Sequence, residues 1–291
     1  EGLLTAKAVE VKEQRSMSLP MHWLLASPLY PGVLQAISLL VFGLVVYFGL
    51  FGTIRPARNF ATVVTWTLWW PLLPLTLFLF GRAWCAVCPI TIGIDGVQRF
   101  AKPKRSPSQF LRRYGVWIMA FTFILLTWAD RMWSITGSPR ATAALLLVLF
   151  GTAVIAALFY QKRAFCRYLC PIGALTGLYA MTAAVELRSK GPATCRDCTQ
   201  ECYKGDKSVD GCPLYQYVKT MDTNRNCNLC GQCVKTCPHG AIELRLRPPG
   251  RELWSLRSPQ VSEAVLAVLL LALVYMQTLD MTNAWGSFMR W

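Results

Sequence analysis

The sequence predicts a mostly α-helical integral membrane protein that also carries a polar, cysteine-rich segment. Three observations support this fold class: five long apolar stretches, a composition with 54% hydrophobic and only 15% charged residues, and twelve cysteines gathered in tight groups. A hydrocarbon core of about 30 Å requires roughly 20 helical residues. Ordinary soluble domains carry about 25% charged residues, so this chain has too few charges to cover its whole surface with them.

Each apolar stretch is long enough to be a membrane span. The second contains Pro71 and Pro74, which lack backbone N–H donors and therefore predict a kinked helix that only buried neighbours tolerate. Glu263, near the start of the fifth, is tolerable only close to the membrane interface. The predicted spans are residues 33–51, 61–80, 114–133, 141–160 and 261–279.

Lys and Arg are distributed unevenly among the segments that separate the spans. Segments 1–32, 81–113 and 161–260 hold 25 of the 30 Lys and Arg, and the three alternate segments hold five. The positive-inside rule therefore makes the first group cytoplasmic. The formal charge of +15 indicates topology and attraction to anionic lipids. It does not indicate a nucleic-acid binder, which carries its basic residues on a water-soluble fold.

An internal repeat relates two parts of the first four spans. Residues 81–93 read GRAWCAVCPITIG and residues 162–174 read KRAFCRYLCPIGA. The copies share an Arg-Ala-aromatic-Cys beginning and a Cys-Pro-Ile end. Each copy follows the second span of a pair, so the sequence predicts two two-helix halves, each with a Cys-Pro motif at its cytoplasmic end.

The Cys-Pro motifs contain four cysteines whose role the sequence leaves open. Their spacings of three and four predict that each pair shares one helical face, and symmetric packing of the halves would bring the two pairs together. Three interpretations remain: a third metal or iron–sulfur centre, a thiol or disulfide redox site, and a structural helix end. Arg82, Arg163 and Arg167 would either favour thiolates nearby or anchor the interface. The four cysteines are Cys85, Cys88, Cys166 and Cys170.

Eight further cysteines form two consecutive runs, C-x2-C-x3-C-x9-C-P and C-x2-C-x2-C-x3-C-P. The second run matches the bacterial [4Fe-4S] pattern, in which the fourth cysteine ligates the other cluster. Two zinc sites are the alternative, but zinc sites rarely need two interleaved runs that each end in Cys-Pro. Crossed ligation assigns cluster one to Cys195, Cys198, Cys202 and Cys237. It assigns cluster two to Cys212, Cys227, Cys230 and Cys233.

Other residues bear on redox chemistry in the membrane. The two histidines, His22 and His239, both lie outside the spans, which excludes paired histidine ligands for a b-type haem within this chain; His239 is interpreted as a local hydrogen-bonding residue. Asp95 and Asp130 are candidates to accept a quinol proton, or else solvated helix ends. A tryptophan group either lines a quinone pocket or anchors the interface. Its members are Trp66, Trp69, Trp70 and Trp84.

Four spans, two Cys-Pro motifs at helix ends (85–89 and 166–171) and the double cysteine run at 195–237 resemble the NapH/NosR-type membrane polyferredoxins. The fifth span is similar to the copper-oxidase assembly branch of that family, which is CcoG-like. The resemblance implies a redox subunit of a quinol dehydrogenase or oxidoreductase complex in the bacterial inner membrane, exchanging electrons with quinol through two [4Fe-4S] clusters. The alternative is an assembly or maturation factor that reduces a metal or a thiol with its membrane Cys-Pro motifs.

The predicted organisation has five parts, and its cytoplasmic α+β module is a bacterial-type 2[4Fe-4S] ferredoxin. The predicted partners are membrane lipids, the quinol pool and other subunits of a membrane complex, and nucleic acid is not among them. The parts are a cytoplasmic segment (1–32), a four-helix transmembrane domain (33–180), the ferredoxin module (181–260), a fifth transmembrane helix (261–279) and an external tail (280–291).

Overall fold

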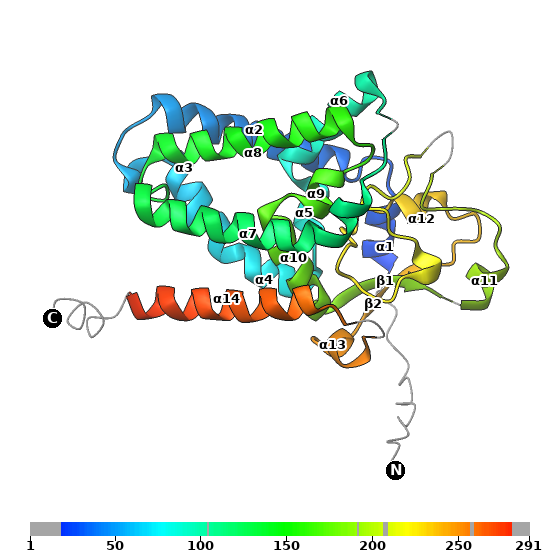
Figure 1. Cartoon of the computed structure of the whole chain (residues 1–291). Coiled ribbons are helices and arrows are strands. Elements are labelled where there is room, and N and C mark those ends of the chain that lie inside the picture. The colour runs from blue at the N-terminus through cyan, green and yellow to red at the C-terminus, as the bar shows by residue number, and fades with distance from the viewer. Residues whose placement is uncertain (1–18, 104, 191, 206–208, 257–258, 281–291) are drawn as a thin grey trace, which may run out of the picture.

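The computed structural model describes residues 19–103, 105–190, 192–205, 209–256 and 259–280. Long helices lie side by side in one part of the molecule, and the cysteine-rich module lies at one end of them (Figure 1). Most of the predicted N-terminal segment (1–18) and external tail (281–291) lie outside the described residues. Five helices are long and apolar enough to cross a membrane, which confirms the predicted mostly helical membrane fold. They are Gly32–Phe51, Phe60–Phe80, Gln109–Trp133, Pro139–Phe159 and Val261–Leu279.

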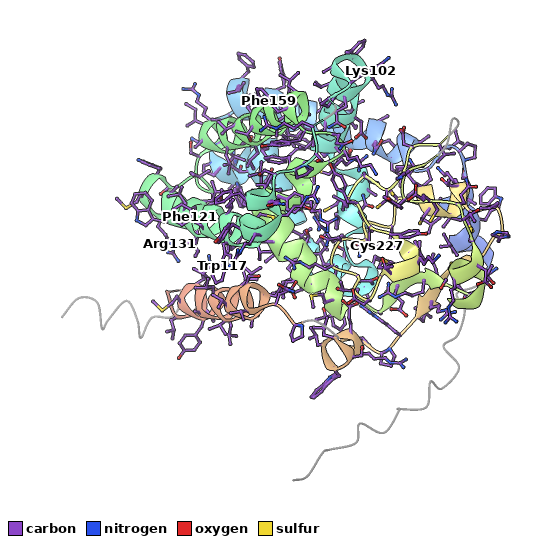
Figure 2. All side chains as sticks on the ribbon, turned by 45° about the vertical axis from the view of Figure 1, so that its right-hand side comes forward. Lys102, Trp117, Phe121, Arg131, Phe159 and Cys227 are labelled. Carbon is purple, nitrogen blue, oxygen red and sulfur yellow. The ribbon has the colours of Figure 1, made fainter. Side chains whose placement is uncertain are left out.

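The outer face of the helices is apolar. Figure 2 shows side chains projecting all around the long helices, and Trp117, Phe121 and Phe159 are exposed in the isolated chain. Apolar side chains on the outside of a helical bundle are what a hydrocarbon solvent requires. This face is therefore the surface that lipid would cover.

Local chemistry sets the helix boundaries. α2 (Gly32–Phe51) and α14 (Val261–Asp280) match the predicted spans to within a residue. α7 (Gln109–Trp133) begins five residues earlier than predicted. The reason is that the hydroxyl of Ser108 accepts a hydrogen bond from the N–H of Leu111 at 3.2 Å and so caps the helix.

The second span is helical but not uniform. It consists of α3 (Phe60–Thr62), a π-helical segment η2 (Val63–Trp69) and α4 (Trp70–Phe80). Pro71 stands in the first turn of α4, where a missing N–H costs little, and Pro74 lies inside it. The distortion that the two prolines predict takes the form of the wide π turn that precedes them.

After each second span the chain forms one short helix and one longer helix. In the first half these are α5 (Ala83–Val87) and α6 (Pro89–Ala101). In the second half they follow α8 (Pro139–Phe159) and are α9 (Ala164–Tyr168) and α10 (Pro171–Thr182). α6 packs against α2 and also against α8 of the other half, while α10 packs against α7 and also against α4 of the other half. The last helix of each half therefore packs against helices of both halves.

The cysteine-rich module is closed by an antiparallel pair of strands, β1 (Val185–Ser189) and β2 (Ile242–Leu246). The buried residues of both strands form one core, and the two cysteine runs lie between the strands in the chain. The connecting elements are short, so the module is α+β in character. They are α11 (Pro192–Asp197), the 3-10 helix η3 (Val218–Thr220) and α12 (Gln232–Thr236).

Arg247, just after β2, joins the module to the membrane helices. It is 6% exposed and donates to the carbonyl oxygens of Ala183 at 2.9 Å and Met181 at 3.0 Å, at the end of α10. It also pairs with Glu186 at 3.0 Å and with Glu252 of α13 (Arg251–Ser255) at 2.5 Å. One buried guanidinium thus caps a helix of the bundle and neutralises carboxylates of the module.

The N-terminal helix α1 (Leu19–Ala26) packs against α12 and β2. Gly231, between two cysteines of the second run, has φ +77, and a Cβ there would lie 2.3 Å from the carbonyl oxygen of Leu25. Tyr30, which follows α1, donates from its hydroxyl to the carbonyl oxygen of Leu229 at 2.9 Å. The second cysteine run is therefore held against the N-terminal segment at a position that only glycine fits.

Gly231→Ala is expected to lower the melting temperature of the detergent-purified protein substantially. The substitution imposes a left-handed conformation on an L residue, which costs about 1–2 kcal/mol, and it adds a clash with α1. Gly240→Ala is the matched control, because Gly240 also has positive φ (+53) but has no atom within 4 Å of its Cβ position. Equal losses of melting temperature in both variants would show that α1 moves aside without cost.

Candidate iron–sulfur sites

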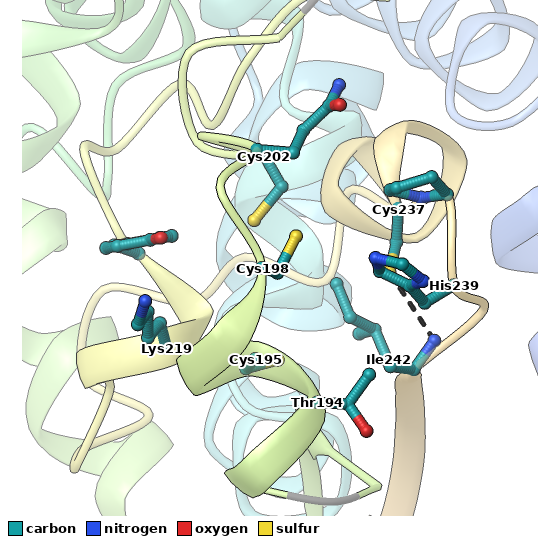
Figure 3. Close-up of a pocket in the computed structure, with 12 residues that line it drawn as sticks. Thr194, Cys195, Cys198, Cys202, Lys219, Cys237, His239 and Ile242 are labelled. Carbon is teal, nitrogen blue, oxygen red and sulfur yellow. Dashed lines mark hydrogen bonds between the residues drawn. The ribbon is translucent and has the colours of Figure 1, made fainter.

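The eight cysteines of the two runs surround two cavities in the module. The first cavity is also lined by Tyr217, Lys219 and His239. Figure 3 shows the sulfur atoms of Cys198 and Cys202 facing each other across it. The four cysteines that line this cavity are Cys195, Cys198, Cys202 and Cys237. These are the residues predicted for cluster one, three from the first run and one from the second.

The second cavity is lined by the complementary set of cysteines. Its other lining residues include Leu187 of β1, Val218 of η3 and Asn228. The helix η3 separates the two cavities, since Val218 lines the second while Tyr217 and Lys219 line the first. The cysteines that line the second cavity are Cys212, Cys227, Cys230 and Cys233. The structure thus divides the eight cysteines as the crossed pattern predicts, while their role as cluster ligands stays a prediction.

Backbone N–H groups point at the last cysteine of each run. The N–H of Gln216 donates to Sγ of Cys212 at 3.3 Å, and the N–H of Ala241 donates to Sγ of Cys237 at 3.4 Å. In both cases the donor lies four residues after a cysteine that is followed by proline. Hydrogen bonds to cluster sulfur are among the factors that set a reduction potential, so the repeated Cys-Pro turn supplies one such bond to each set.

Burial and mutual repulsion make free thiolates unfavourable in both cavities. Burial, followed by the charge of Cys237, raises the pKa of Cys202 to about 11. Burial likewise raises the pKa of Cys230 to about 12, with a further contribution from Cys212. Four thiolates in one cavity therefore need a positive core, which iron supplies.

The geometry suits a cluster better than a single ion. Among the described residues, no three His, Cys, Asp or Glu side chains lie close enough to hold one metal ion. A zinc ion would draw its thiolates in to about 2.3 Å, whereas a cube bound at four corners holds its thiolates farther apart. Two groups of four cysteines, one around each cavity, therefore fit two cubane-type [4Fe-4S] clusters.

Two buried donors near the cysteines have no partner. In the described part of the chain, Arg82 Nε and Asn228 Nδ2 are the two buried side-chain nitrogen or oxygen atoms without a hydrogen bond. Asn228 is 2% exposed and lines the second cavity. Such orphaned donors are costly unless an acceptor is present, and cluster sulfur would be one. The sequence did not point to Asn228, since a polar residue inside C-x2-C has no distinctive spacing.

The membrane cysteines are not arranged on helical faces as predicted. Cys85 lies in α5 and Cys166 in α9, but Cys88 and Cys170 have extended backbone conformations and precede α6 and α10. The prediction of one shared helical face per pair is therefore wrong. The reason is that a residue before proline avoids the α conformation, so each helix ends at the Cys-Pro step and the next one begins with proline.

The two pairs nevertheless come together. Burial, followed by the charges of Cys85 and Cys170, raises the pKa of Cys88 to about 12. Burial also raises the pKa of Cys170 to about 11, with Cys85 as the next contributor. The hydroxyl of Thr176 in the second half lies 3.8 Å from Sγ of Cys85 in the first. Four cysteines from the two halves thus form one group, which we call the membrane cysteine set.

Arginines surround this set. Arg163 pairs with Asp95 at 2.6 Å and Arg167 donates to the carbonyl oxygen of Leu214. Asp95, a candidate proton acceptor, is therefore engaged in an ion pair. The other candidate, Asp130, accepts a hydrogen bond from the N–H of Thr136 at 2.7 Å and fastens the turn after α7.

The tryptophan group contributes mainly to packing. Trp66 donates from Nε1 to the hydroxyl of Thr142 at 2.9 Å. Trp69, Trp70 and Trp84 pack against a buried core that includes Leu73, Leu77 and Met119. His239 lies beside Cys237 at the first cavity (Figure 3), while the side chain of His22 lies outside the described residues.

Family models locate iron–sulfur domains in both parts of the molecule. A 4Fe-4S binding domain matches residues 62–108 and 142–189, one match in each half, which supports the internal repeat. A second 4Fe-4S binding domain matches residues 224–243. The first match pair includes the membrane cysteine set, and the second includes the second run. Cys195, Cys198, Cys202 and Cys212 lie outside the matched stretches.

Three known proteins are similar to parts of this chain. YccM of Escherichia coli, named as a candidate electron transport protein, is 33% identical over 33% of this chain and 25% of its own length. The ferredoxin-type protein NapH of Haemophilus influenzae is 23% identical over 57% of this chain and 63% of its own length. An uncharacterized protein of Methanocaldococcus jannaschii is 24% identical over 64% and 71% of the two chains.

The matched region thus spans a quarter of YccM and less than two thirds of NapH. No solved structure matches the chain significantly. The five candidate membrane helices and the similarity to NapH support a multi-pass membrane protein. Together with the 4Fe-4S domain matches, the similarity to NapH and YccM supports a NapH-type polyferredoxin, at modest identity.

Proposed function

We propose that this iron–sulfur electron-transfer protein holds one [4Fe-4S] cluster in each cavity of its module and exchanges electrons between membrane quinol and a partner oxidoreductase. One observation carries the proposal: eight cysteines from two runs divide into two sets of four, each with ligands from both runs. The clusters would supply the redox chemistry. The chain supplies thiolates, N–H donors and burial.

The cavities differ in their distance from the membrane helices. Cys212 of the second set packs against the same buried core as Cys166 and Cys170. The N–H of Arg163 donates to the carbonyl oxygen of Pro213 at 3.1 Å. The second set therefore adjoins the membrane cysteine set. We assign it as the inner cluster, and the set that contains Cys195 as the outer cluster, which faces the partner.

The membrane cysteine set is proposed to hold a third metal or iron–sulfur centre. Its four members come from both halves, lie within electrostatic reach of one another and are free of disulfides. The 4Fe-4S domain match to each half favours this proposal over a purely structural role. A metal- or thiol-reducing assembly factor remains the second candidate, because the same set would then be its reactive site.

The distribution of Lys and Arg along the chain supports a proposed membrane orientation and proposed partners. The excess of Lys and Arg in segments 81–113 and 161–260 supports a cytoplasmic module in the bacterial inner membrane. The basic cytoplasmic face would contact anionic lipid headgroups. Other subunits of a membrane complex would receive or supply the electrons.

Iron and sulfide counts, with anaerobic reduction by a quinol analogue, test the function. About eight irons per chain are expected from the two module clusters, and any excess indicates a third centre. Bleaching of the cluster absorbance by the quinol analogue, alone or with a partner complex, is expected. A chain with complete clusters that quinol does not reduce would contradict the quinol assignment. Replacing the four membrane cysteines separates the candidates, because an assembly factor would lose function with both module clusters still visible by electron paramagnetic resonance.

A further inference from the structure

Arg82 is a buried cation whose charge the protein leaves unbalanced. It is 2% exposed and lies three residues before Cys85. Its guanidinium donates to the carbonyl oxygens of Arg225 at 3.0 Å and Cys166 at 3.1 Å, and its Nε has no partner. Within the described ranges, no carboxylate forms an ion pair with it. Burying an uncompensated charge costs several kcal/mol, so a negative group is needed close by.

The internal repeat provides the comparison. Arg163 occupies the matching position, three residues before Cys166, and donates to the carbonyl oxygen of Cys85 at 3.4 Å. Each arginine therefore reaches the first cysteine of the opposite motif. Arg163 has a counter-ion, however, because Asp95 lies 2.6 Å away.

The repeat places Gly177 where a second aspartate would stand. Asp95 follows the cysteine of its Cys-Pro step by seven residues, and Gly177 follows Cys170 by the same number. A Cβ at Gly177 would lie 3.7 Å from Nη1 of Arg82. The position thus lies beside Arg82 and also beside Arg225, whose Cγ and carbonyl oxygen are 3.3 and 3.4 Å from the same Cβ position, but this sequence supplies no carboxylate there.

Arg82 lies at the junction of two cysteine sets. Its guanidinium donates to the carbonyl oxygen of Cys166 in the membrane set and to that of Arg225, two residues before Cys227 of the inner set. Its neighbour Ala83 packs against the same buried core as Cys227 and Cys233. Arg225 is also near, but it is paired with Glu263. Arg82 is therefore a buried cation without a carboxylate partner among the described residues, and the negative groups it can meet are the thiolates of these sets.

We propose that Arg82 is a positioning residue that acts as the buried counter-cation of the inner cluster and raises its reduction potential. The inference rests on the proposed function. A [4Fe-4S]²⁺ core with four thiolates carries about −2 and gains one further negative charge when it accepts an electron. A fixed positive charge stabilises the reduced form more than the oxidised form. The inner cluster is thereby favoured as electron acceptor over a cluster without such a cation.

The test is a redox titration of the purified full chain, followed by electron paramagnetic resonance, with Cys230→Ser identifying the inner cluster's signal. Arg82→Gln is expected to shift the inner midpoint potential to a lower value, and Arg82→Lys to restore most of it. The double variant Arg163→Gln with Asp95→Asn removes a neutral pair from the matching site and is expected to leave the potential almost unchanged. An unshifted inner potential in Arg82→Gln with complete iron content would overturn the proposal.

A second pair of variants keeps Arg82 in place. Gly177→Asp adds a negative charge beside the guanidinium, and Gly177→Asn adds a side chain of the same size without the charge. The Asp variant is expected to titrate at a lower potential than the Asn variant, and equal potentials would overturn the proposal even if Arg82→Gln does not fold. Absence of clusters from the unaltered chain would instead refute the proposed function, so the two failures are distinguishable.

Discussion

A Cys237→Ser variant is expected to lose the outer cluster, although Cys237 belongs to the second run. Its sulfur lines the first cavity with Cys195, Cys198 and Cys202, so iron and sulfide should each fall by about four per chain. Cys212→Ser should remove the inner cluster for the same reason, since Cys212 lines the second cavity. The measurement is metal and sulfide content together with the paramagnetic resonance spectrum of each reduced variant.

The control for this experiment is His239→Asn. His239 lines the first cavity beside Cys237, and we interpret it as a hydrogen-bonding residue, so both clusters should remain. Cys227→Ser completes the comparison, because crossed ligation requires that it and Cys237→Ser remove different signals. If these two variants lost the same signal, each run would fill its own cluster and the crossed assignment would be wrong.

Arg247→Met is expected to destabilise the joint between the module and the membrane helices. The substitution leaves Glu186 and Glu252 with Arg188 as their one shared cation, at the longer distances of 3.3 and 3.7 Å, and removes donors to the end of α10. Breaking one side of a buried ion pair typically costs about 3–5 kcal/mol. The urea concentration at which half of the cluster absorbance is lost should fall accordingly.

Lys204→Met serves as the control for Arg247. Lys204 also pairs with a carboxylate, that of Glu201, but both side chains are exposed, and ion pairs in water contribute little. Its urea midpoint should equal that of the unaltered protein. A midpoint in Arg247→Met that also stayed unchanged would mean that the module does not depend on this joint.

Much of the architecture could be predicted from local sequence signals. Apolar length predicts the spans because a bilayer imposes it on any helix, and Pro71 with Pro74 predicts the disturbed second span. Cysteine spacing predicts which residues gather around each cavity. A tight loop brings three closely spaced cysteines together, and the crossed pattern of such runs assigns the fourth cysteine to the other set. The prediction that Cys85 and Cys88 share one helical face was wrong, because the proline after Cys88 disfavours the helical conformation that the spacing requires.

Features that depend on distant contacts could not be predicted. The packing of α6 and α10 against helices of both halves leaves no periodic signal in the sequence. Each helix has the same pattern of apolar residues whichever half it contacts. The sequence places Arg82 near the cysteines. Its lack of a counter-ion becomes visible only in the folded chain, where Asp95 pairs with Arg163 and Gly177 stands at the matching position near Arg82. The partnerless amide of Asn228 likewise requires the folded second cavity.

Both the membrane cysteine set and the module sets combine cysteines that are far apart in the chain, which constrains the order of biogenesis. The membrane cysteine set needs α9 and the segment that follows it, so this set is still incomplete when the first half has left the ribosome. Cys237 is the last of the eight module cysteines to be synthesised, and the outer set is incomplete without it. Since domains emerge from the N-terminus onward, four cysteines can gather around the first cavity only after the chain has passed residue 237.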